Sequence, residues 1–173
     1  MDAHTTVDPG HFRRVLSHFA SGVVIVTGVV DGHPVGLTCQ SFTSLSLNPP
    51  MVLFCPSKTS TSWPRLATVP YLCVNVLNAE QHELSEAFAR SGTDKFAGVA
   101  WSPTPHGAPA LGGAAAHIEA RIAACYDGGD HHIVTCVVGA LSAGSDPDPL
   151  LYYRSSYRAL DHSNHSGRWR QFA

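Results

Sequence analysis

The first hydrophobic pattern along the chain has helical spacing. In residues 8–22, DPGHFRRVLSHFASG, apolar side chains recur every three or four positions, which places them on one helix face. Asp8 suits the N-cap and Pro9 the first helical position, so the segment predicts an amphipathic helix. Similar spacing in residues 78–92 predicts a second helix that stops at Gly92, and a short helix is expected over residues 63–67.

Most of the remaining hydrophobic runs have the length and composition of β-strands. Residues 23–30 and 33–42 are joined by Asp31-Gly32, a dipeptide that favours a type I′ hairpin turn. Further strands are expected in residues 49–55, 71–77, 115–128, 130–144 and 150–154. In 115–128, His117, Glu119 and Arg121 alternate with apolar residues, so we expect that polar face to lie in water or at an interface. The Gly- and Pro-rich residues 93–113 are expected to form a loop.

These elements predict one domain with a mainly β fold and flanking helices. Six or seven strands in mostly meander order favour a small, closed or partly closed antiparallel barrel. A doubly wound parallel sheet would need helices between most strands. The length of 173 residues suits a single core, which we place in residues 1–161, with residues 162–173 as a polar tail.

Composition and charge narrow the classes of partner. A net charge of −2 and a pI near 6.6 provide no basic face for nucleic acid. No apolar run is long enough for a membrane span, and the first residues lack the order of a signal peptide, so a cytoplasmic protein with no membrane partner is expected. The five cysteines are an odd number and include no CxxC pair, which favours core residues over disulfides or a zinc site.

Two hydroxyl-rich segments carry the first candidate chemistry, without any of the standard glycine-rich phosphate motifs. In CPSKTSTSWPRL, residues 55–66, five hydroxyl side chains and Lys58 precede the expected short helix and could bind an anion; the alternative is a helix N-cap with a solvated loop. In GLTCQSFTSLSLNPP, residues 36–50, polar side chains run from a strand end into a turn, with Leu37, Phe42 and Leu45 free to face the core. The alternative there is an edge strand with its polar face in water.

A third candidate is YDGGDHHIV, residues 126–134. Its acids and histidines have the composition of a metal site, but neighbouring strand residues point to opposite faces, so His131 and His132 cannot readily share one ion. The better functional interpretation is a turn from which one histidine reaches a cleft, and the plainer one is a hairpin turn with surface histidines. Likewise, Asp94 and Lys95 either contact a ligand or are solvated loop residues.

Taken together, these segments resemble the short-chain flavin reductase family, the small NAD(P)H-dependent reductase components of two-component flavin monooxygenases. The matching pieces keep their order over roughly residues 9–160: FASGVVIVT (19–27), GLTCQSFTSLSLNPPMVLFCPSKTSTSW (36–63), YLCVNVL (71–77), FARSGTDKFAG (88–98), GDHHIV (129–134) and LLYYRSSYRAL (150–160).

The resemblance implies an antiparallel Greek-key split β-barrel of the FMN-binding type, and a homodimer with the flavin near the dimer interface. It also implies that His131 faces the nicotinamide side of the flavin, as the candidate catalytic residue. No metal site is expected, because of the opposite directions of His131 and His132. The implied cofactor-binding residues are Gly36, Leu37, Thr38, Cys39, Gln40, Ser41, Cys55, Pro56, Ser57, Lys58, Thr59, Ser62, Lys95, Phe96 and Arg154.

The implied function is an NAD(P)H:flavin oxidoreductase that reduces FMN, or FAD, by hydride transfer and supplies reduced flavin to a partner monooxygenase. Because the two cofactors carry this chemistry, no acid, base or nucleophile motif is expected. The sequence does not distinguish NADH from NADPH, and FMN is preferred over FAD only because the resemblance to this family favours it. Three alternatives stay open: a binding-only split-barrel flavoprotein or electron carrier, a pyridoxamine-phosphate-oxidase-like oxidase, and a metal-dependent enzyme.

Overall fold

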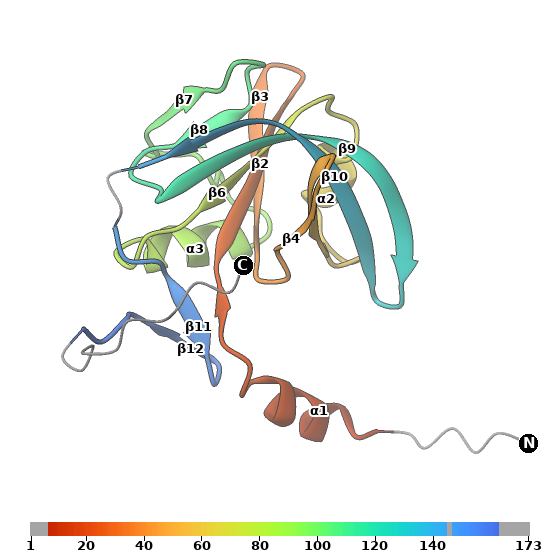
Figure 1. Ribbon diagram of the computed structural model, residues 1–173, viewed down its shortest axis with the longest axis vertical. Coiled ribbons are helices and arrows are strands. Elements are labelled where there is room, and N and C mark those ends of the chain that lie inside the picture. Colours follow the sequence, from red (N-terminus) through yellow and green to blue (C-terminus); the bar gives the residue numbers. More distant parts are fainter. Residues whose placement is uncertain (1–6, 145–146, 163–173) are drawn as a thin grey trace, which may run out of the picture.

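The computed structural model describes residues 7–144 and 147–162. Its centre is a curved antiparallel sheet of seven strands (Figure 1), in the order β3-β2-β6-β9-β10-β5-β4. The strands are β2 (Val24–Val30), β3 (His33–Cys39), β4 (Thr43–Leu47), β5 (Pro50–Phe54), β6 (Leu72–Val76), β9 (Ala116–Gly128) and β10 (His131–Ala143). Although β3 and β4 follow each other in the chain, they are the two edges of this sheet. The barrel is therefore split between them, as expected.

The predicted hairpin of β2 and β3 is confirmed. Val30 pairs with His33, and both turn residues have positive φ, 51° at Asp31 and 78° at Gly32. A type I′ turn requires this conformation at both positions. The local sequence therefore fixes the register of the first hairpin.

A second, much longer hairpin of β9 and β10 joins the two halves of the barrel. β9 pairs with β6, and β10 pairs with β5. Its register is interrupted between Thr135 and Cys136 and again between Val138 and Ala140, and such bulges bend a strand pair. Figure 1 shows the hairpin arching over the other strands.

The expectation that the alternating polar residues of β9 lie in water or at an interface is wrong for Glu119, which is buried within the chain. Arg121 is exposed and His117 is half-buried, but Glu119 is only 2% exposed. Its carboxylate accepts hydrogen bonds from the backbone and the ring of His106, which stacks on Tyr71. Burial raises the pKa of Glu119, but the contacts from Thr104 and His106 outweigh it and leave the pKa below its ordinary value.

Residues 93–113 are not only a loop. β7 (Trp101–Pro103) and β8 (Pro109–Leu111) form a short hairpin. Its second strand is held to the barrel by buried groups: Thr27 donates to the carbonyl of Pro109, at 2.5 Å, and Asn75 accepts from the N–H of Leu111, at 2.7 Å. The segment that carries His106 therefore covers the face of β9 that holds Glu119.

Two hydrophobic clusters fill the molecule. The larger one, which includes Val26, Phe54, Trp63 and Val134, fills the barrel. The smaller one includes Ile25, Leu77 and Leu150 and packs around Phe88 of α3 (His82–Ala89). Three of the five cysteines are buried, and none forms a disulfide.

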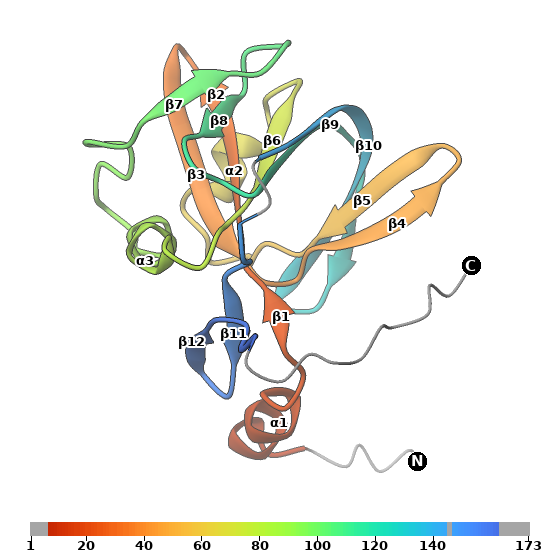
Figure 2. The ribbon, with the colours of Figure 1, turned by 60° about the vertical axis from the view of Figure 1, so that its left-hand side comes forward.

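The predicted N-terminal helix, α1 (Pro9–Leu16), is confirmed, including its cap: Asp8 Oδ1 accepts from the N–H of His11 at 2.7 Å. α1 is joined to the barrel through β1 (Ser21–Gly22), which pairs with β11 (Leu151–Tyr153) and, through it, with β12 (Ser156–Arg158). Figures 1 and 2 both show α1 standing apart from the barrel. Its apolar residues Phe12, Val15 and Leu16 are 50–55% exposed, and Phe19, which follows the helix, is 79% exposed.

The remaining helices agree with expectation in position, although α3 ends before Gly92. α2 (Trp63–Leu66) is one short turn. No helix among the described residues is both long and apolar enough to cross a membrane. The predicted polar tail, apart from His162, lies outside the described residues.

Candidate functional site

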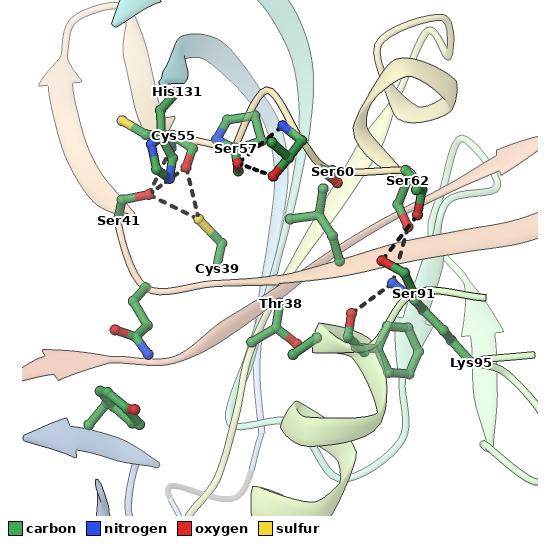
Figure 3. Close-up of a pocket in the computed structure, with 18 of the residues that line it drawn as sticks. Thr38, Cys39, Ser41, Cys55, Ser57, Ser60, Ser62, Ser91, Lys95 and His131 are labelled. Atoms are coloured by element: carbon green, nitrogen blue, oxygen red, sulfur yellow. Dashed lines mark hydrogen bonds between the residues drawn. The ribbon is translucent and has the colours of Figure 1, made fainter. Parts of the chain in front are cut away.

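A cavity of about 600 Å³ lies beside the carboxyl ends of β3 and β5, where the barrel is split (Figure 3). Small polar side chains make up much of its wall. Figure 3 shows His131 and Cys55 toward one end and Ser62, Ser91 and Lys95 toward the other. The lining residues are Leu37, Thr38, Cys39, Gln40, Ser41, Cys55, Pro56, Ser57, Thr59, Ser60, Thr61, Ser62, Phe88, Ala89, Ser91, Lys95, His131, Tyr152 and Tyr157.

At the histidine end, side-chain hydrogen bonds join the residues that follow β3 to the residue that follows β5. Ser41 Oγ accepts from the N–H of Cys55 at 2.9 Å and lies 3.1 Å from the Cys55 carbonyl. Cys39 Sγ lies 3.0 Å from the same hydroxyl. These bonds hold the two hydroxyl-rich segments side by side. The family resemblance predicts that both segments bind one ligand, but the sequence does not show how they contact each other.

The turn between β9 and β10 is tied to the segment after β5. Lys58 N–H donates to the Asp130 carbonyl and His132 N–H donates to the Pro56 carbonyl, both at 2.9 Å. These bonds place His131 in the cavity wall. The ring of His132 instead lies beside Trp63, which belongs to the larger hydrophobic cluster. Neighbouring strand residues face opposite ways, and this is why one histidine of the pair reaches the cavity and the other does not.

His131 is oriented by the residue before it. Its Nδ1 lies 2.7 Å from Asp130 Oδ1, and this hydrogen bond lowers the pKa of the Asp130 carboxyl. The other ring nitrogen, Nε2, makes no hydrogen bond within residues 7–144 and 147–162. His131 is half-buried and can offer Nε2 to a ligand.

At the opposite end, the ammonium group of Lys95 is held by neutral acceptors only. Nζ donates to the carbonyls of Gly36 and Phe88, at 3.2 and 2.8 Å, and to Ser62 Oγ at 3.1 Å. Partial burial lowers the pKa of Lys95, and no carboxylate pairs with it in the part of the chain that the structure describes. A cation held without a counter-ion in a cavity favours an anionic ligand.

The hydroxyl groups between these two ends are arranged as a continuous wall. Ser57 Oγ lies 2.9 Å from Thr59 Oγ1, and Thr61 donates to Ser91 at 3.4 Å. Ser60 Oγ accepts from the N–H of Trp63, the first residue of α2, at 3.1 Å, whereas Ser62, the N-cap of α2, makes no side-chain cap hydrogen bond. The segment thus satisfies one N–H group at the start of the helix and also forms a wall of the cavity.

Part of the second hydroxyl-rich segment, residues 36–50, lines the cavity, and part of it is an exposed edge strand. Thr38, Gln40 and Ser41 line the cavity, whereas Thr43 and Ser44 are exposed on β4, an edge strand. The expectation that Leu45 faces the core is wrong, because it is 46% exposed.

Four predicted site residues lie outside this cavity. Lys58 Nζ pairs with Asp127 at 2.5 Å, and its hydrogen bond lowers the pKa of that carboxyl. Gly36 and Phe96 line a second cavity, and Arg154 lines a groove beside α1. The other predicted residues meet at the first cavity: His131, Leu37, Thr38, Cys39, Gln40, Ser41, Cys55, Pro56, Ser57, Thr59, Ser62 and Lys95.

Two tyrosines of the C-terminal hairpin were missed by sequence reasoning. Tyr152 and Tyr157 both line the cavity, and Tyr157 OH lies 2.9 Å from Ser85 Oγ on α3. Ser85 in turn accepts, through its carbonyl, from Thr38 Oγ1 at 2.6 Å. The quoted segment LLYYRSSYRAL contained both tyrosines, but only a three-dimensional arrangement shows that they, rather than Arg154, reach this wall. Phe88, Ala89 and Ser91 were missed in the same way.

The carboxylates of the candidate metal site in residues 126–134 contact other side chains. Asp127 pairs with Lys58, and Asp130 bonds to His131. Among the described residues, no group of three or more His, Cys, Asp or Glu side chains could hold a metal ion.

Comparison with known proteins agrees with this geometry. The family described as "Flavin reductase like domain" matches residues 16–161. The reductase subunit HsaB of a flavin-dependent monooxygenase from Rhodococcus jostii is 45% identical over 92% of this chain and 82% of its own.

Solved structures give the same result. Nitrilotriacetate monooxygenase component B from Mycobacterium thermoresistibile superimposes with a TM-score of 0.87, at 44% identity over 93% of this chain and 92% of its own. The NADH:FAD oxidoreductase SgcE6 of Streptomyces globisporus, solved with NAD and FAD fragments, has a TM-score of 0.84 at 36% identity, over 91% of this chain and 98% of its own.

Proposed function

The chain belongs to the family of flavin reductase like domains, and on that premise we propose that it is an NAD(P)H:flavin oxidoreductase. It reduces FMN or FAD by hydride transfer and supplies the reduced flavin to a partner monooxygenase. The observation that carries the proposal is the polarity of the cavity: His131 at one end, the ammonium group of Lys95 with no carboxylate partner among the described residues at the other, and hydroxyl groups between them.

The cavity fits an elongated ligand with a flat ring and an anionic tail. Cys39, Cys55 and Pro56 give the histidine end walls of low polarity, and the Ser57–Ser62 hydroxyls continue toward Lys95. A flavin has a ring, a ribityl chain with hydroxyl groups, and a phosphate in this order. A bound flavin supplies the hydride-accepting chemistry, with the nicotinamide as hydride donor.

The residues of the chain have binding and orienting roles. Lys95, fixed by three acceptors, stabilises the negative charge of the tail. His131, fixed by Asp130, offers Nε2 to the nicotinamide side. Holding two rings in contact contributes several kcal/mol through orientation alone, more than the about 1–2 kcal/mol of one hydrogen bond, so few catalytic side chains are needed.

The test is an assay of purified protein at 340 nm with NADH or NADPH, with and without added FMN or FAD. We expect NAD(P)H oxidation that increases with free flavin and produces peroxide in air, above the rate of the same mixture without protein. Tight flavin binding with no turnover would contradict the proposal and favour the binding-only flavoprotein or the oxidase.

The same premise leads us to propose a homodimer. Phe12 of α1 and Phe19, which follows the helix, are at least half exposed, and they form part of an apolar patch that a second copy would cover. Phe12 and Arg13 also line a groove that His131 shares, so the second copy would border the site. Light scattering should give twice the 18.4 kDa of one chain, and Phe12→Glu with Phe19→Glu should shift the mass toward one copy. A monomeric wild-type protein would contradict this.

A further inference from the structure

A second cavity, of about 420 Å³, begins where the first one ends. The two cavities share Thr61, Ser62 and Lys95 in their walls. The second lies between the start of β3, α2 and the loop after α3, and its wall includes His33, Arg65 and Phe96. The shared residues belong to the lysine end of the first cavity, opposite His131, as Figure 3 shows.

The second cavity carries an excess of basic groups. Arg65 and Lys95 both line it, and Asp94 is its one carboxylate. Asp94 Oδ1 accepts the N–H of Phe96 at 3.1 Å, and neither basic group has an ion-pair partner within the described residues. Arg65 is exposed, so its guanidinium is free for an anion, for which its planar donors are suited.

The same cavity also has apolar surface beside the basic groups. Phe96 is half-buried, and its ring packs against Phe88 and Trp101, with centroids 4.9 and 6.4 Å away. Pro34 adds a second rigid apolar wall. Aromatic and basic side chains together are a suitable lining for a nucleotide, which has a flat base and a phosphate.

We propose that the second cavity binds the adenosine monophosphate half of FAD, with Arg65 contacting its phosphate. This inference rests on the proposed function, which places the flavin ring near His131 and the ribityl phosphate near Lys95. FMN ends at that phosphate, whereas FAD continues with a second phosphate and adenosine. FMN would therefore fill the first cavity alone, and FAD would fill both.

An adenosine phosphate is also part of NAD(P)H, but the position of the cavity favours FAD. The nicotinamide has to reach the His131 end of the first cavity, whereas the second cavity joins the opposite end. Arg65 is accordingly a specificity residue that distinguishes FAD from FMN.

The test compares Arg65→Gln with the wild type and with Arg121→Gln, which removes an exposed arginine on β9 outside both cavities. The Kd of FAD and of FMN is measured by fluorescence titration of the purified full chain, and KM for both flavins and for NADH by turnover. We expect Arg65→Gln to raise the Kd and KM of FAD about fivefold, the size of one exposed charge-assisted contact. The FMN values should stay within about twofold, Arg65→Lys should restore part of the FAD affinity, and Arg121→Gln should match the wild type.

Two outcomes overturn the assignment. An equal change for FAD and FMN, or none, shows that Arg65 does not contact the adenylate half. A rise in the KM of NADH with unchanged FAD affinity shows that the nucleotide belongs to the nicotinamide cofactor. Failure of the proposed function is a separate result: the wild type would bind both flavins but oxidise no NAD(P)H, and the two Kd values would still decide on Arg65.

Discussion

Gly36 lies between the core and the second cavity, and replacing it with alanine should destabilise the protein. A Cβ atom there would lie 2.5 and 2.7 Å from two ring carbons of Phe88, whereas nonbonded carbons prefer about 3.5–4.0 Å. The ring would have to move by about 1 Å. Phe88 is fully buried among Val23, Ile25 and their neighbours, so it has little room to do so.

The expected cost follows from this geometry. Because the ring of Phe88 has little room to move, we expect the upper part, about 2–3 kcal/mol, of the range that overpacking a core costs. The loss of glycine from a strand returns about 0.5–1 kcal/mol, which leaves a net loss of about 1–2.5 kcal/mol. For a chain of this size that lowers Tm by roughly 2–10 °C. Because the carbonyls of Gly36 and Phe88 both accept from Lys95, the affinity for flavin should fall as well.

Thermal unfolding followed by circular dichroism, together with flavin titration, checks both parts. Gly22→Ala is the matched control on strand β1, since no atom lies within 4 Å of its added Cβ, and its Tm should equal or slightly exceed that of the wild type. Adding Phe88→Leu to Gly36→Ala should recover part of the loss by making space. A Gly36→Ala protein that melts with the wild type and binds flavin equally well would refute the tight packing of Phe88 against β3.

Three further variants test the site and its support. His131→Ala should raise the KM of NAD(P)H by about 5- to 30-fold, the worth of one hydrogen bond, with a smaller fall in kcat; a collapse of kcat at unchanged KM would contradict this. Lys95→Met should raise the KM of flavin about tenfold, whereas Lys58→Ala, which breaks a surface pair with an exposed carboxylate, should leave it within about twofold; equal effects would show that the two lysines were assigned wrongly. The lowered pKa of Glu119 means that its charged form stabilises the fold above the ordinary carboxyl pKa. That stability is lost as the pH falls through the lowered value. The Tm of the wild type should therefore fall more over that range than the Tm of Glu119→Gln, in which the carboxyls of Asp127 and Asp130, with their own lowered pKa values, remain.

The parts of the fold that the sequence predicted are those decided by neighbouring residues. The cap at Asp8 and the turn at Asp31-Gly32 involve groups within three residues of each other. Periodicity then gave the long strands and the helices. The β7–β8 hairpin was missed because prolines interrupt any pattern there, and its stability comes from Thr27 and Asn75, far away in the chain.

The errors at the site have the same origin. Lys58 lies in the hydroxyl-rich segment, but its partner Asp127 is 69 residues away, on β9. The role predicted for Lys58, contact with the anionic tail of the flavin, fits Lys95 better. The hydrogen-bond acceptors of Lys95 come from β3, α3 and the segment before α2. Glu119 alternates with apolar residues, a pattern typical of a solvent-exposed strand face, yet the segment around His106 covers it. Which polar residue meets solvent and which meets a ligand depends on contacts that no local pattern contains.

The distribution of charge in the cavity separates two tasks of the protein. The ammonium group of Lys95 lies at the end of the cavity opposite His131. Hydride transfer needs no general acid or base at the reacting end, because its rate depends mainly on how closely the two rings are held. Substitutions at the lysine end should therefore change which flavin binds, and substitutions around His131 should change how the nicotinamide binds. Neither kind of substitution should change the hydride-transfer reaction itself.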